Sequence, residues 1–482
     1  MNKNILDLLS DYVYFVNIFF IITIIFVERK KPVYSLFWIT ILTLTSYLGF
    51  IAYLMFGLSF RKKRITKKFY KRNLFRRAPK ERSEDIKKLE PWKLLINYFE
   101  FTGKNRLTFS NAVKVYTHGR GLFNDIIRDI KKAKTFIHLE YFIFNYDELG
   151  RKIGELLMKK AREGVEIKLI VDGVGSRQLP RHFIKELKKS GIELETFFPL
   201  YFPLIHLRVN YRTHRKIIII DGKSGYMGGF NVGDEYLGKG PLGYWRDTHV
   251  RLQGTIILEL QKEFFSSWNF TKEQKIFKKK RKEVTPLDLK RYFPTVKTIG
   301  ECPMQVVGSA PDYDFRLIRD GFLRIISSAK KYIYIHTPYF IPDDSTYEAL
   351  KLASLSGVKV KIIIPDKPDH MMVYWASLSY VGELMNYGID FYTYNNGFLH
   401  SKMIVSDDTI ATLGSSNFDH RSFYQNFEIN TFFYDRKVVY QLKKAFIEDL
   451  KLSSKMSNEG YKHRKGIVKL KESISRLFSP IL

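Results

Sequence analysis

The sequence has a single cysteine and few of the motifs that usually announce a metal or nucleotide enzyme. Cys302 is the only cysteine in 482 residues, so one chain can form neither a disulfide nor a zinc site built from several thiolates. The chain also contains no H-E-x-x-H motif and no phosphate-binding P-loop. These absences exclude a disulfide scaffold and leave no familiar motif for zinc proteolysis or nucleotide hydrolysis.

Acidic residues are also comparatively scarce. The chain has 49 Asp and Glu against 80 Lys and Arg, which gives a formal net charge of +31. An excess this large attracts polyanions, and both nucleic acid and anionic lipid qualify. Because 45% of the residues are hydrophobic, the chain is also able to bury the cores of two or three folded units.

Long apolar runs are present at the N-terminus. We expect residues 1–60 to form a membrane anchor, a transmembrane helical hairpin with helices over residues 12–27 and 33–56. The second run has 24 uncharged residues, enough to cross a hydrocarbon core of about 30 Å as a helix. The first has 16, which leaves open whether it spans the bilayer or lies at its surface. No small-residue cleavage site follows it, so a cleaved signal peptide is not expected.

A strongly basic segment follows directly. Residues 61–82 contain twelve Lys or Arg and one acidic residue, Glu81. Cations clustered beside a membrane helix mark its cytoplasmic side and attract anionic headgroups. A nucleic-acid-binding arm has a similar composition, but the neighbouring apolar run favours lipid. We assign residues 61–104 to this basic juxtamembrane segment.

The rest of the chain has the pattern of a duplicated α/β protein. Helical periodicity alternates with buried strands such as Gly164 to Asp172. Corresponding segments recur at offsets of 198, 193 and 186 residues, a drift that small loop deletions explain. The sequence therefore predicts two homologous halves, residues 105–270 and 300–450, joined by a basic connector over 271–299. A basic tail, residues 451–482, has no function that its sequence indicates.

Two short stretches repeat the same polar pattern, H-x-K-x4-D. The first contains His214, Lys216 and Asp221, and the second contains His400, Lys402 and Asp407. In a strand, alternate residues face the same side, so the His and Lys of each stretch point the same way. Each Asp begins the turn after its strand and accepts hydrogen bonds that fix the end of that strand. We group all six residues as the catalytic set, with the two Asp as support.

A His beside a Lys suits phosphoryl transfer. The ammonium binds phosphate oxygens, while imidazole attacks phosphorus or moves a proton near neutral pH. With two such pairs, one His attacks and the other protonates the leaving alcohol. The two Lys supply the charge stabilisation that a metal often provides, so we expect no metal and no cofactor.

The segments after each motif add supporting groups. Asn231 and Asn417 each lie 17 residues after their His, in turns rich in small residues that also contain Ser415. We expect these groups to bind phosphate or support the site. Asp247 and Glu428 follow in the respective halves, and we expect each to orient the His of its own half through the second ring nitrogen.

The paired motifs resemble those of the phospholipase D superfamily, and their surroundings resemble its bacterial cardiolipin synthases. The similar segments are residues 210–216 (NYRTHRK), 233–236 (GDEY), 245–249 (WRDTH), 337–342 (TPYFIP), 397–402 (GFLHSK), 417–422 (NFDHRS) and 426–428 (NFE). The resemblance implies two phospholipase D-like halves, each a mixed sheet flanked by helices, that share one active site. It also implies transfer of a phosphatidyl group between two phosphatidylglycerol molecules through a phosphohistidine, with His214 as nucleophile and His400 as acid.

Three other functions remain possible from the sequence. A phospholipase D or another phosphatidyltransferase uses the same groups, because water reaching the phosphohistidine turns transfer into hydrolysis. A nuclease of the superfamily fits the charge but not the apolar N-terminus. A non-enzymatic lipid-binding adaptor predicts a degenerate motif in one half, and both are intact. We therefore expect anionic phospholipid and the membrane as partners, no nucleic acid, an inner-membrane multi-pass location and a cytoplasmic catalytic domain. The sequence does not indicate the oligomeric state.

Overall fold

The computed structural model describes residues 5–28, 32–53, 89–199, 211–274, 291–296, 298–311 and 315–482. It divides into an N-terminal helical unit and a large α/β unit, and each is described by itself. The basic segment of residues 61–82 and most of the connector over 271–299 lie outside the described residues.

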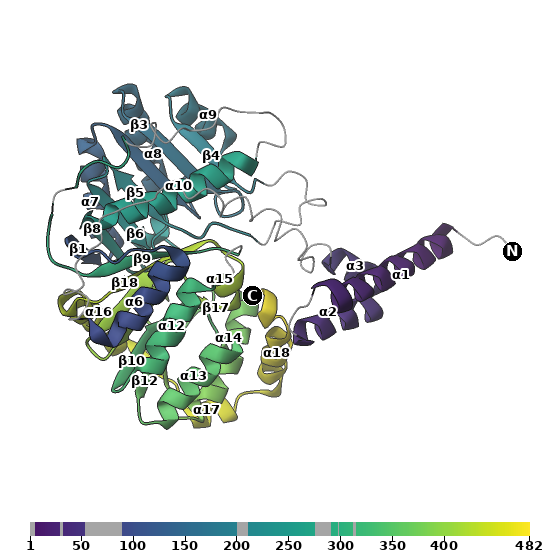
Figure 1. Ribbon diagram of the computed structural model, residues 1–482. Helices are drawn as coiled ribbons and strands as arrows, with labels where there is room; N and C mark the ends of the chain where they lie inside the picture. Colours follow the sequence, from purple (N-terminus) through teal and green to yellow (C-terminus); the bar gives the residue numbers. More distant parts are fainter. Residues whose placement is uncertain are drawn as a thin grey trace. The chain divides into compact units, whose positions relative to one another are not determined.

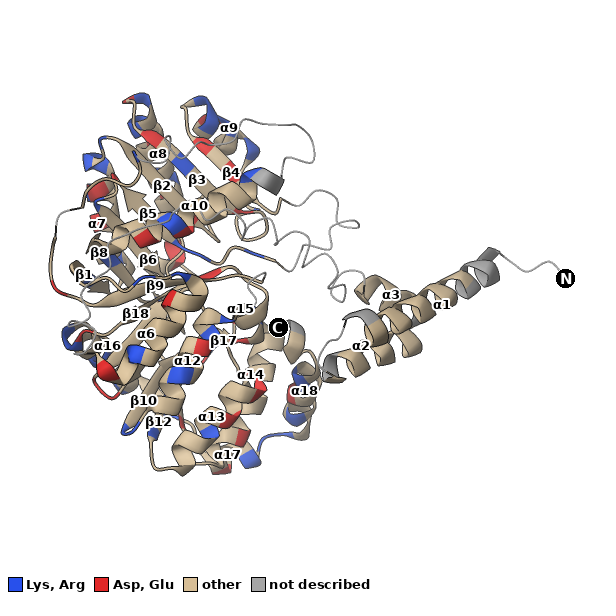
Figure 2. Ribbon diagram, viewed as in Figure 1, with Lys and Arg blue, Asp and Glu red and all other residues tan. Residues whose placement is uncertain are grey.

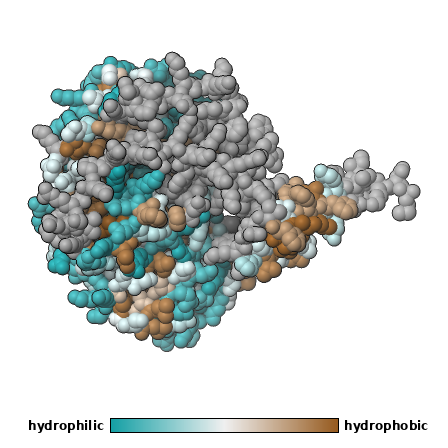
Figure 3. Space-filling view, in the orientation of Figure 1, coloured by the Kyte–Doolittle hydropathy of each residue, from teal (hydrophilic) through white to brown (hydrophobic). Residues whose placement is uncertain are grey.

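The described residues of the N-terminal unit form three α-helices. They are α1 (Ile5–Thr23), which continues into a π-helical turn over Ile24–Glu28, α2 (Pro32–Leu44) and α3 (Ser46–Ala52) (Figure 1). A small core of Ile24, Trp38, Leu42 and Tyr53 holds them together. No residue that Figure 2 colours in these helices is charged, and Figure 3 shows many hydrophobic residues on their surface. These exposed apolar side chains include Phe15, Phe19, Phe26, Leu36 and Leu48.

The single long helix expected over residues 33–56 was wrong. The backbone leaves the helical conformation at Thr45, with φ −125° and ψ 54°, and so separates α2 from α3. The hydroxyls of Thr43 and Thr45 each donate to the carbonyl four residues earlier, an arrangement that bends helices. Within the described ranges, no helix is both long and apolar enough to cross a membrane, so the predicted transmembrane hairpin over 12–27 and 33–56 is not supported.

The first half of the large unit is built on a seven-stranded mixed sheet in the order β1-β8-β6-β5-β2-β3-β4. Strands β2, β3 and β4 pair in parallel, and the remaining pairs are antiparallel. The strands are β1 (Asn111–Tyr116), β2 (Phe136–Tyr141), β3 (Glu166–Asp172), β4 (Glu193–Phe197), β5 (Ile217–Ile220), β6 (Ser224–Gly228) and β8 (His249–Gly254). The helices are α7 (Gly119–Lys132), α8 (Glu148–Arg162), α9 (Arg181–Lys189) and α10 (Ile256–Gln274).

Strand β2 shows how the helices cover both faces of this sheet. Ile137, Leu139 and Tyr141 point into a core shared with α7 and α8. The alternate residue His138 points to the other face, where it bonds Gln261 of α10. The sheet is therefore buried between helical layers, as expected for strands made largely of Ile, Leu and Val.

The second half repeats the same strand order with one strand added. Its sheet runs β19-β13-β12-β10-β15-β16-β18-β9, and removal of the edge strand β19 leaves the order of the first half. The strands are β9 (Met304–Ser309), β10 (Tyr332–His336), β12 (Lys359–Pro365), β13 (Asp390–Tyr394), β15 (Met403–Ser406), β16 (Ile410–Gly414), β18 (Glu428–Phe433) and β19 (Ser453–Lys455). The predicted duplication and the predicted mixed sheets flanked by helices are confirmed.

Helices again cover this second sheet, and some come from outside the repeat. They are α6 (Lys93–Tyr98), α12 (Leu317–Ser328), α13 (Asp344–Leu355), α14 (Met371–Met385), α15 (His420–Tyr424), α16 (Arg436–Lys451), α17 (Asn458–Lys462) and α18 (Gly466–Leu477). Short two-stranded pairings join segments beside the two main sheets: β11 (Phe340–Ile341) with β17 (Phe418–Asp419), and β7 (Trp245–Arg246) with β14 (Phe398–Leu399). The β7–β14 pair links the two halves.

The two Asp of the repeated motifs fix the strand ends as expected. Asp221 accepts hydrogen bonds from the backbone N–H groups of Lys134, Thr135 and Phe136 at 2.8–3.1 Å, which join the beginning of β2 to the end of β5. Asp407 accepts the corresponding bonds from residues 330–332. Both Asp have positive φ, 53° and 52°, in the turn that follows the strand.

We expect Asp221→Asn to destabilise the fold by about 1–2 kcal/mol, because an amide nitrogen would face backbone donors. Asn tolerates positive φ, so the change tests the hydrogen bonds rather than the turn. Denaturant unfolding in detergent measures the effect. The control is Glu348→Gln, which removes a surface carboxylate paired with Lys351 and should change stability by less than about 0.5 kcal/mol. Equal effects from the two variants would contradict the role given to Asp221.

Candidate active site

Each motif histidine is held by the opposite half of the large unit. The backbone N–H of His214 donates to the carbonyl of Phe427 at 2.9 Å, beside a bridge between Thr213 and Phe427. The backbone N–H of His400 donates to the carbonyl of Arg246 at 2.7 Å, where β14 pairs with β7. Phe427 and Arg246 are the residues immediately before Glu428 and Asp247. The first half therefore donates this backbone hydrogen bond to the second, and the second half donates the equivalent bond to the first.

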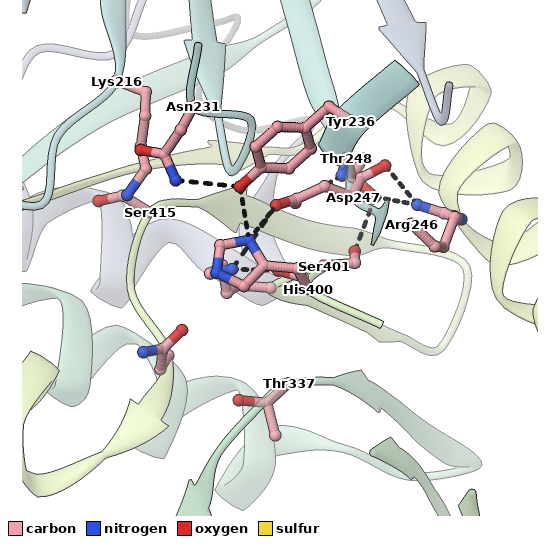
Figure 4. A network of polar contacts seen from close by, with 12 residues as sticks. Lys216, Asn231, Tyr236, Arg246, Asp247, Thr248, Thr337, His400, Ser401 and Ser415 are labelled. Carbon is pink, nitrogen blue, oxygen red and sulfur yellow. Dashed lines mark hydrogen bonds and ion pairs between the residues drawn. The ribbon is translucent and has the colours of Figure 1, made fainter. Parts of the chain in front are cut away.

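These backbone contacts bring each carboxylate to the histidine of the other half. His214 Nδ1 lies 3.1 Å from both carboxylate oxygens of Glu428. His400 Nδ1 lies 2.6 Å from Asp247 Oδ2 (Figure 4). The expectation that each acid orients the histidine of its own half was wrong. Strand pairing between the halves places residue 428 beside His214 and residue 247 beside His400, which no spacing within one half reveals.

The crossed pairs determine which ring nitrogen is left for chemistry. A carboxylate accepts a hydrogen bond, so each His carries its proton on Nδ1 and presents the lone pair of Nε2. Both imidazoles are almost completely buried, with 8% and 5% of their surface exposed. Each His is thus fixed in orientation and tautomer before any substrate binds, which is the arrangement that nucleophilic and acid–base histidines require.

The two motif lysines are buried beside their histidines. Lys216 Nζ donates to the carbonyl of His214 at 2.6 Å, and Lys402 Nζ donates to the carbonyl of His400. Lys402 also lies 3.6 Å from Asp247 Oδ2. The His and Lys of each motif share one side of the chain as predicted, although they precede strands β5 and β15 rather than belonging to them.

Burial dominates the electrostatics of this cluster. It lowers the pKa of His214 to about 4 and that of His400 to about 3, so both rings are neutral at neutral pH. Burial also lowers the pKa of Lys402 to about 8, against the opposing charges of Asp247, Glu428 and Asp369. The pKa of Lys216 is lowered in the same way.

The two carboxylates stay ionised in spite of their burial. Burial raises the pKa of Asp247, but Lys402 and His400 outweigh this effect and lower it below its usual value. In Glu428 the opposing groups, His214 and then Lys216, bring the pKa down to about 2. At neutral pH the two carboxylates are therefore ionised, whereas the lysines and histidines bind their protons more weakly than they would in water. An anionic phosphodiester entering it would raise the pKa of the lysines and histidines.

Other polar groups surround the two histidines unequally. Around His400, the hydroxyl of Tyr236 lies 3.2 Å from Nδ1 and accepts a hydrogen bond from Asn231 Nδ2 at 3.0 Å (Figure 4). Around His214, the hydroxyl of Ser415 donates to Glu428, and Asn426 Nδ2 donates to the same carboxylate at 3.2 Å.

The residues predicted to bind phosphate or support the site make different contacts from one another. Asn231 also accepts from the backbone of Ile143 and reaches His400 only through Tyr236. Ser415 orients Glu428 instead of standing free for phosphate. Asn417 is buried, and its backbone N–H donates to the hydroxyl of Ser422 at 3.2 Å. Asp221 and Asp407 lie at the far ends of β5 and β15 from the lysines, about 16 Å away along the strand.

Tyr236 and Asn426 were not predicted as site residues. Their only sequence signal was membership of two short segments, residues 233–236 and 426–428, that follow the family pattern. A further support also went unpredicted: Arg246 pairs with Asp449 of α16 at 2.7 Å, and Thr248 shares a hydrogen bond with Ser401 across the halves. Among the described residues, no group of three or more His, Cys, Asp or Glu is arranged to hold a metal ion.

Comparison with known proteins gives close relatives over nearly the whole chain. The family described as "Cardiolipin synthase, PLD-like domain" matches residues 126–268 and 322–450, and "Phospholipase D-nuclease N-terminal" matches residues 15–57. The chain is 43% identical to the major cardiolipin synthase of Bacillus subtilis, over 99% of this chain and 100% of that protein. It is 42% identical to a cardiolipin synthase of Staphylococcus aureus, over 97% and 95%.

A solved structure shares the fold at much lower identity. The phosphatidylserine synthase of Haemophilus influenzae superposes with a TM-score of 0.59 and 13% identity, covering 77% of this chain and 95% of that one. At this identity the likeness shows the fold alone.

The crossed pairing predicts which histidine responds to each acid. In ¹⁵N spectra of labelled histidines, Glu428→Gln should change the Nδ1 signal of His214 and leave that of His400 in place. Asp247→Asn should do the reverse, since each amide replaces the ionised partner of one ring. Signals are assigned from His214→Asn and His400→Asn. A response within the same half would contradict the pairing.

Burial of neutral histidines also predicts a pH dependence of folding. The unfolded chain binds protons on these side chains near pH 6.5, whereas folded His214 and His400 bind them only near pH 4 and 3. Their contribution to stability is therefore complete above pH 6.5 and is lost as the pH falls toward 4, by up to about 1.4 kcal/mol per pH unit for each. Denaturant unfolding at pH 7 and pH 5 measures this loss. The variant His214→Asn/His400→Asn should show a smaller loss, and an unchanged slope would refute the assignment.

Proposed function

The chain belongs to the cardiolipin synthase family with phospholipase D-like domains, and we propose that it transfers a phosphatidyl group from one phosphatidylglycerol to another. The products are cardiolipin and glycerol. The observation that carries this proposal is the pair of buried His–Lys sites with crossed carboxylates, in a chain more than 40% identical to named cardiolipin synthases over nearly its full length. Both motifs are intact, as a two-histidine reaction requires.

In the first step, Nε2 of one histidine attacks the phosphorus of phosphatidylglycerol. A P–N bond forms and the P–O bond to the glycerol headgroup breaks, while the second histidine, doubly protonated once the anionic phosphodiester is bound, gives its Nε2 proton to the departing glycerol oxygen. In the second step, a hydroxyl of another phosphatidylglycerol gives its proton back to that histidine and attacks phosphorus. The P–N bond then breaks, and both histidines return to their starting state.

We assign His214 as the nucleophile and His400 as the acid and base. The resemblance to the family supports this choice, and Asp247, 2.6 Å from His400 Nδ1, holds that ring in a fixed orientation for proton transfer. The corresponding distance from His214 to Glu428 is 3.1 Å. The charge of the bound phosphodiester raises the pKa of His400, so this ring carries the proton that it donates, while His214 keeps its Nε2 lone pair for attack.

Lys216 and Lys402 bind the non-bridging phosphate oxygens and stabilise the charge that develops at phosphorus. We expect Asn417 to be a further donor to the phosphate, while Asn231 and Ser415 act through Tyr236 and Glu428. The lysine charges perform the task that a divalent cation performs in other phosphoryl transferases, so the proposed reaction uses no metal and no cofactor.

We further propose that the enzyme works at the cytoplasmic face of a bacterial inner membrane. The exposed apolar side chains of α1 to α3 and the net charge of +31 support binding to anionic phospholipid. The proposed domain boundaries remain 1–60, 61–104, 105–270, 271–299, 300–450 and 451–482. Nucleic acid is not expected as a partner.

The decisive test is purified protein in detergent, with phosphatidylglycerol and excess chelator. We expect cardiolipin and free glycerol in equal amounts. His214→Ala and His400→Ala should each lower the rate by at least about 10³-fold, because neither attack nor proton transfer has a substitute. His182→Ala, at an exposed histidine on α9, is the matched control and should stay active. An alkaline quench preserves the acid-labile phosphohistidine.

Each other outcome has a distinct meaning. Phosphatidic acid without cardiolipin would show a phospholipase D and refute the synthase. A strict requirement for a divalent cation would refute the two-histidine reaction. Full activity in either single histidine variant would refute the shared site.

A further inference from the structure

Helix α18, in the C-terminal tail, has its apolar face turned to solvent. Ile467, Leu470, Ile474 and Leu477 follow one another at spacings of three and four residues, which places them on one side of the helix. Their exposed fractions are 56%, 54%, 48% and 68%. A helix on a soluble protein normally buries such a stripe, so this one is unexplained by the packing of the chain.

The polar side of α18 is the side that packs on the protein. Glu472 is 2% exposed and Ser475 is 6% exposed. Glu472 accepts hydrogen bonds from Arg464 and from the hydroxyl of Tyr461, and Arg476 pairs with Glu383 of α14. Ion pairs therefore fix the orientation of the helix, and that orientation presents the apolar stripe outward.

The neighbouring helix α14 also exposes apolar side chains. Lys471 lies over Trp375 and Arg476 over Tyr380, so α14 and α18 run side by side in the same direction. This places the beginning of α14 next to the beginning of α18. Met371 and Met372 stand there, 55% and 46% exposed. We call these six apolar residues the α18 face: Met371, Met372, Ile467, Leu470, Ile474 and Leu477.

Both ends of the α18 face adjoin parts of the active site. Immediately before Met371, Asp369 and His370 line a small surface pocket together with Tyr339, and Asp369 is close enough to Lys402 to oppose the effect of burial on its pKa. After α18, the chain ends against α15, where the backbone N–H of Arg421 donates to Leu482 at 3.0 Å. Helix α15 directly follows β17 and Asn417.

Charge indicates what covers this face. Lys469 and Lys471 are exposed, and helical spacing places them on the two flanks of the stripe, while the exposed Lys462 and Lys465 precede it. An apolar stripe bordered by lysines is typical of helices that lie in the headgroup region of an anionic membrane. A second copy of the chain would bring these cations against its own.

From this geometry, and resting on the proposed function, we infer that the α18 face inserts into the surface of an anionic bilayer and holds the active site at the headgroups. Helix α18 would lie parallel to the membrane, with its stripe among the acyl chains and its lysines among the phosphates. The tail is then a second membrane contact, separate in sequence from the N-terminal helices, that positions the catalytic unit for lipid entry.

Site-directed fluorescence on the full chain tests the contact itself. Leu470→Cys is labelled with an environment-sensitive dye, and Leu352→Cys on α13, 59% exposed, is the matched control. The native Cys302 is buried, and burial raises its pKa, so it resists labelling. In phosphatidylglycerol vesicles containing acyl-chain-brominated lipid, the dye at residue 470 should be quenched at least about twofold and the dye at 352 should not.

Failure of quenching at residue 470 would overturn the inference, whether another segment or a second copy covers the face. Equal quenching in phosphatidylcholine vesicles would overturn the role of the lysines. Because this readout needs no turnover, it is independent of whether the protein makes cardiolipin.

Activity then links the contact to the reaction. Leu470→Gln/Ile474→Gln should lower the rate on phosphatidylglycerol vesicles roughly tenfold, because apolar burial in the membrane is lost. The rate on short-chain, monomeric phosphatidylglycerol should not change. Leu352→Gln/Leu355→Gln is the control on α13. An equal loss on both substrates would mean damage to the site and refute a docking role, while absence of cardiolipin from the unaltered protein would refute the proposed function alone.

Discussion

The hydrogen bond from the backbone of each site histidine to the opposite half is the constraint on which the site depends. It aligns His214 with Phe427 and His400 with Arg246, and the next residue in each case is a carboxylate that binds the ring. The ring orientation, its tautomer and the position of its lysine all follow from one strand-like contact. Neither half contains a complete His–carboxylate pair, so the proposed active site exists only where the two halves meet.

Burial of this cluster costs folding free energy, and it also sets the pKa values on which the proposed reaction depends. Two carboxylates, two lysines and two imidazoles are packed with almost no access to water, and isolated charges there would cost several kcal/mol each. The apolar cores of the two sheets stabilise the arrangement, and the carboxylates offset part of the cationic charge. What remains is a pair of lysines whose pKa burial has lowered and whose pKa an anionic phosphodiester would raise again. The groups are oriented in advance, so little reorganisation accompanies the reaction.

Much of this could be predicted from the sequence, because the relevant signals are local. Equal spacing from each His to its Asn, and the repeat of strand patterns, indicated two halves with the same strand order. The strand-end role of Asp221 and Asp407 followed from their position after an apolar run. The crossed pairing could not be predicted, because it depends on which segments meet across the interface. The break at Thr45 was missed because hydropathy counts its methyl and hydroxyl groups without asking where the hydroxyl binds. The α18 stripe was overlooked because its residues are ordinary core residues in any other setting.

The exchange of acids between the halves has a symmetry of its own. Glu428 of the second half binds His214 of the first, and Asp247 of the first half binds His400 of the second, so each half supplies one carboxylate and one histidine to the other. An interface of this reciprocal kind is what a two-fold dimer of identical subunits possesses. A chain carrying one half could thus complete both sites by pairing with a copy of itself. Within a single chain the two halves are free to differ in sequence, and the surroundings of His214 and His400 do differ: Tyr236 contacts His400, whereas Asn426 and Ser415 bind the carboxylate beside His214.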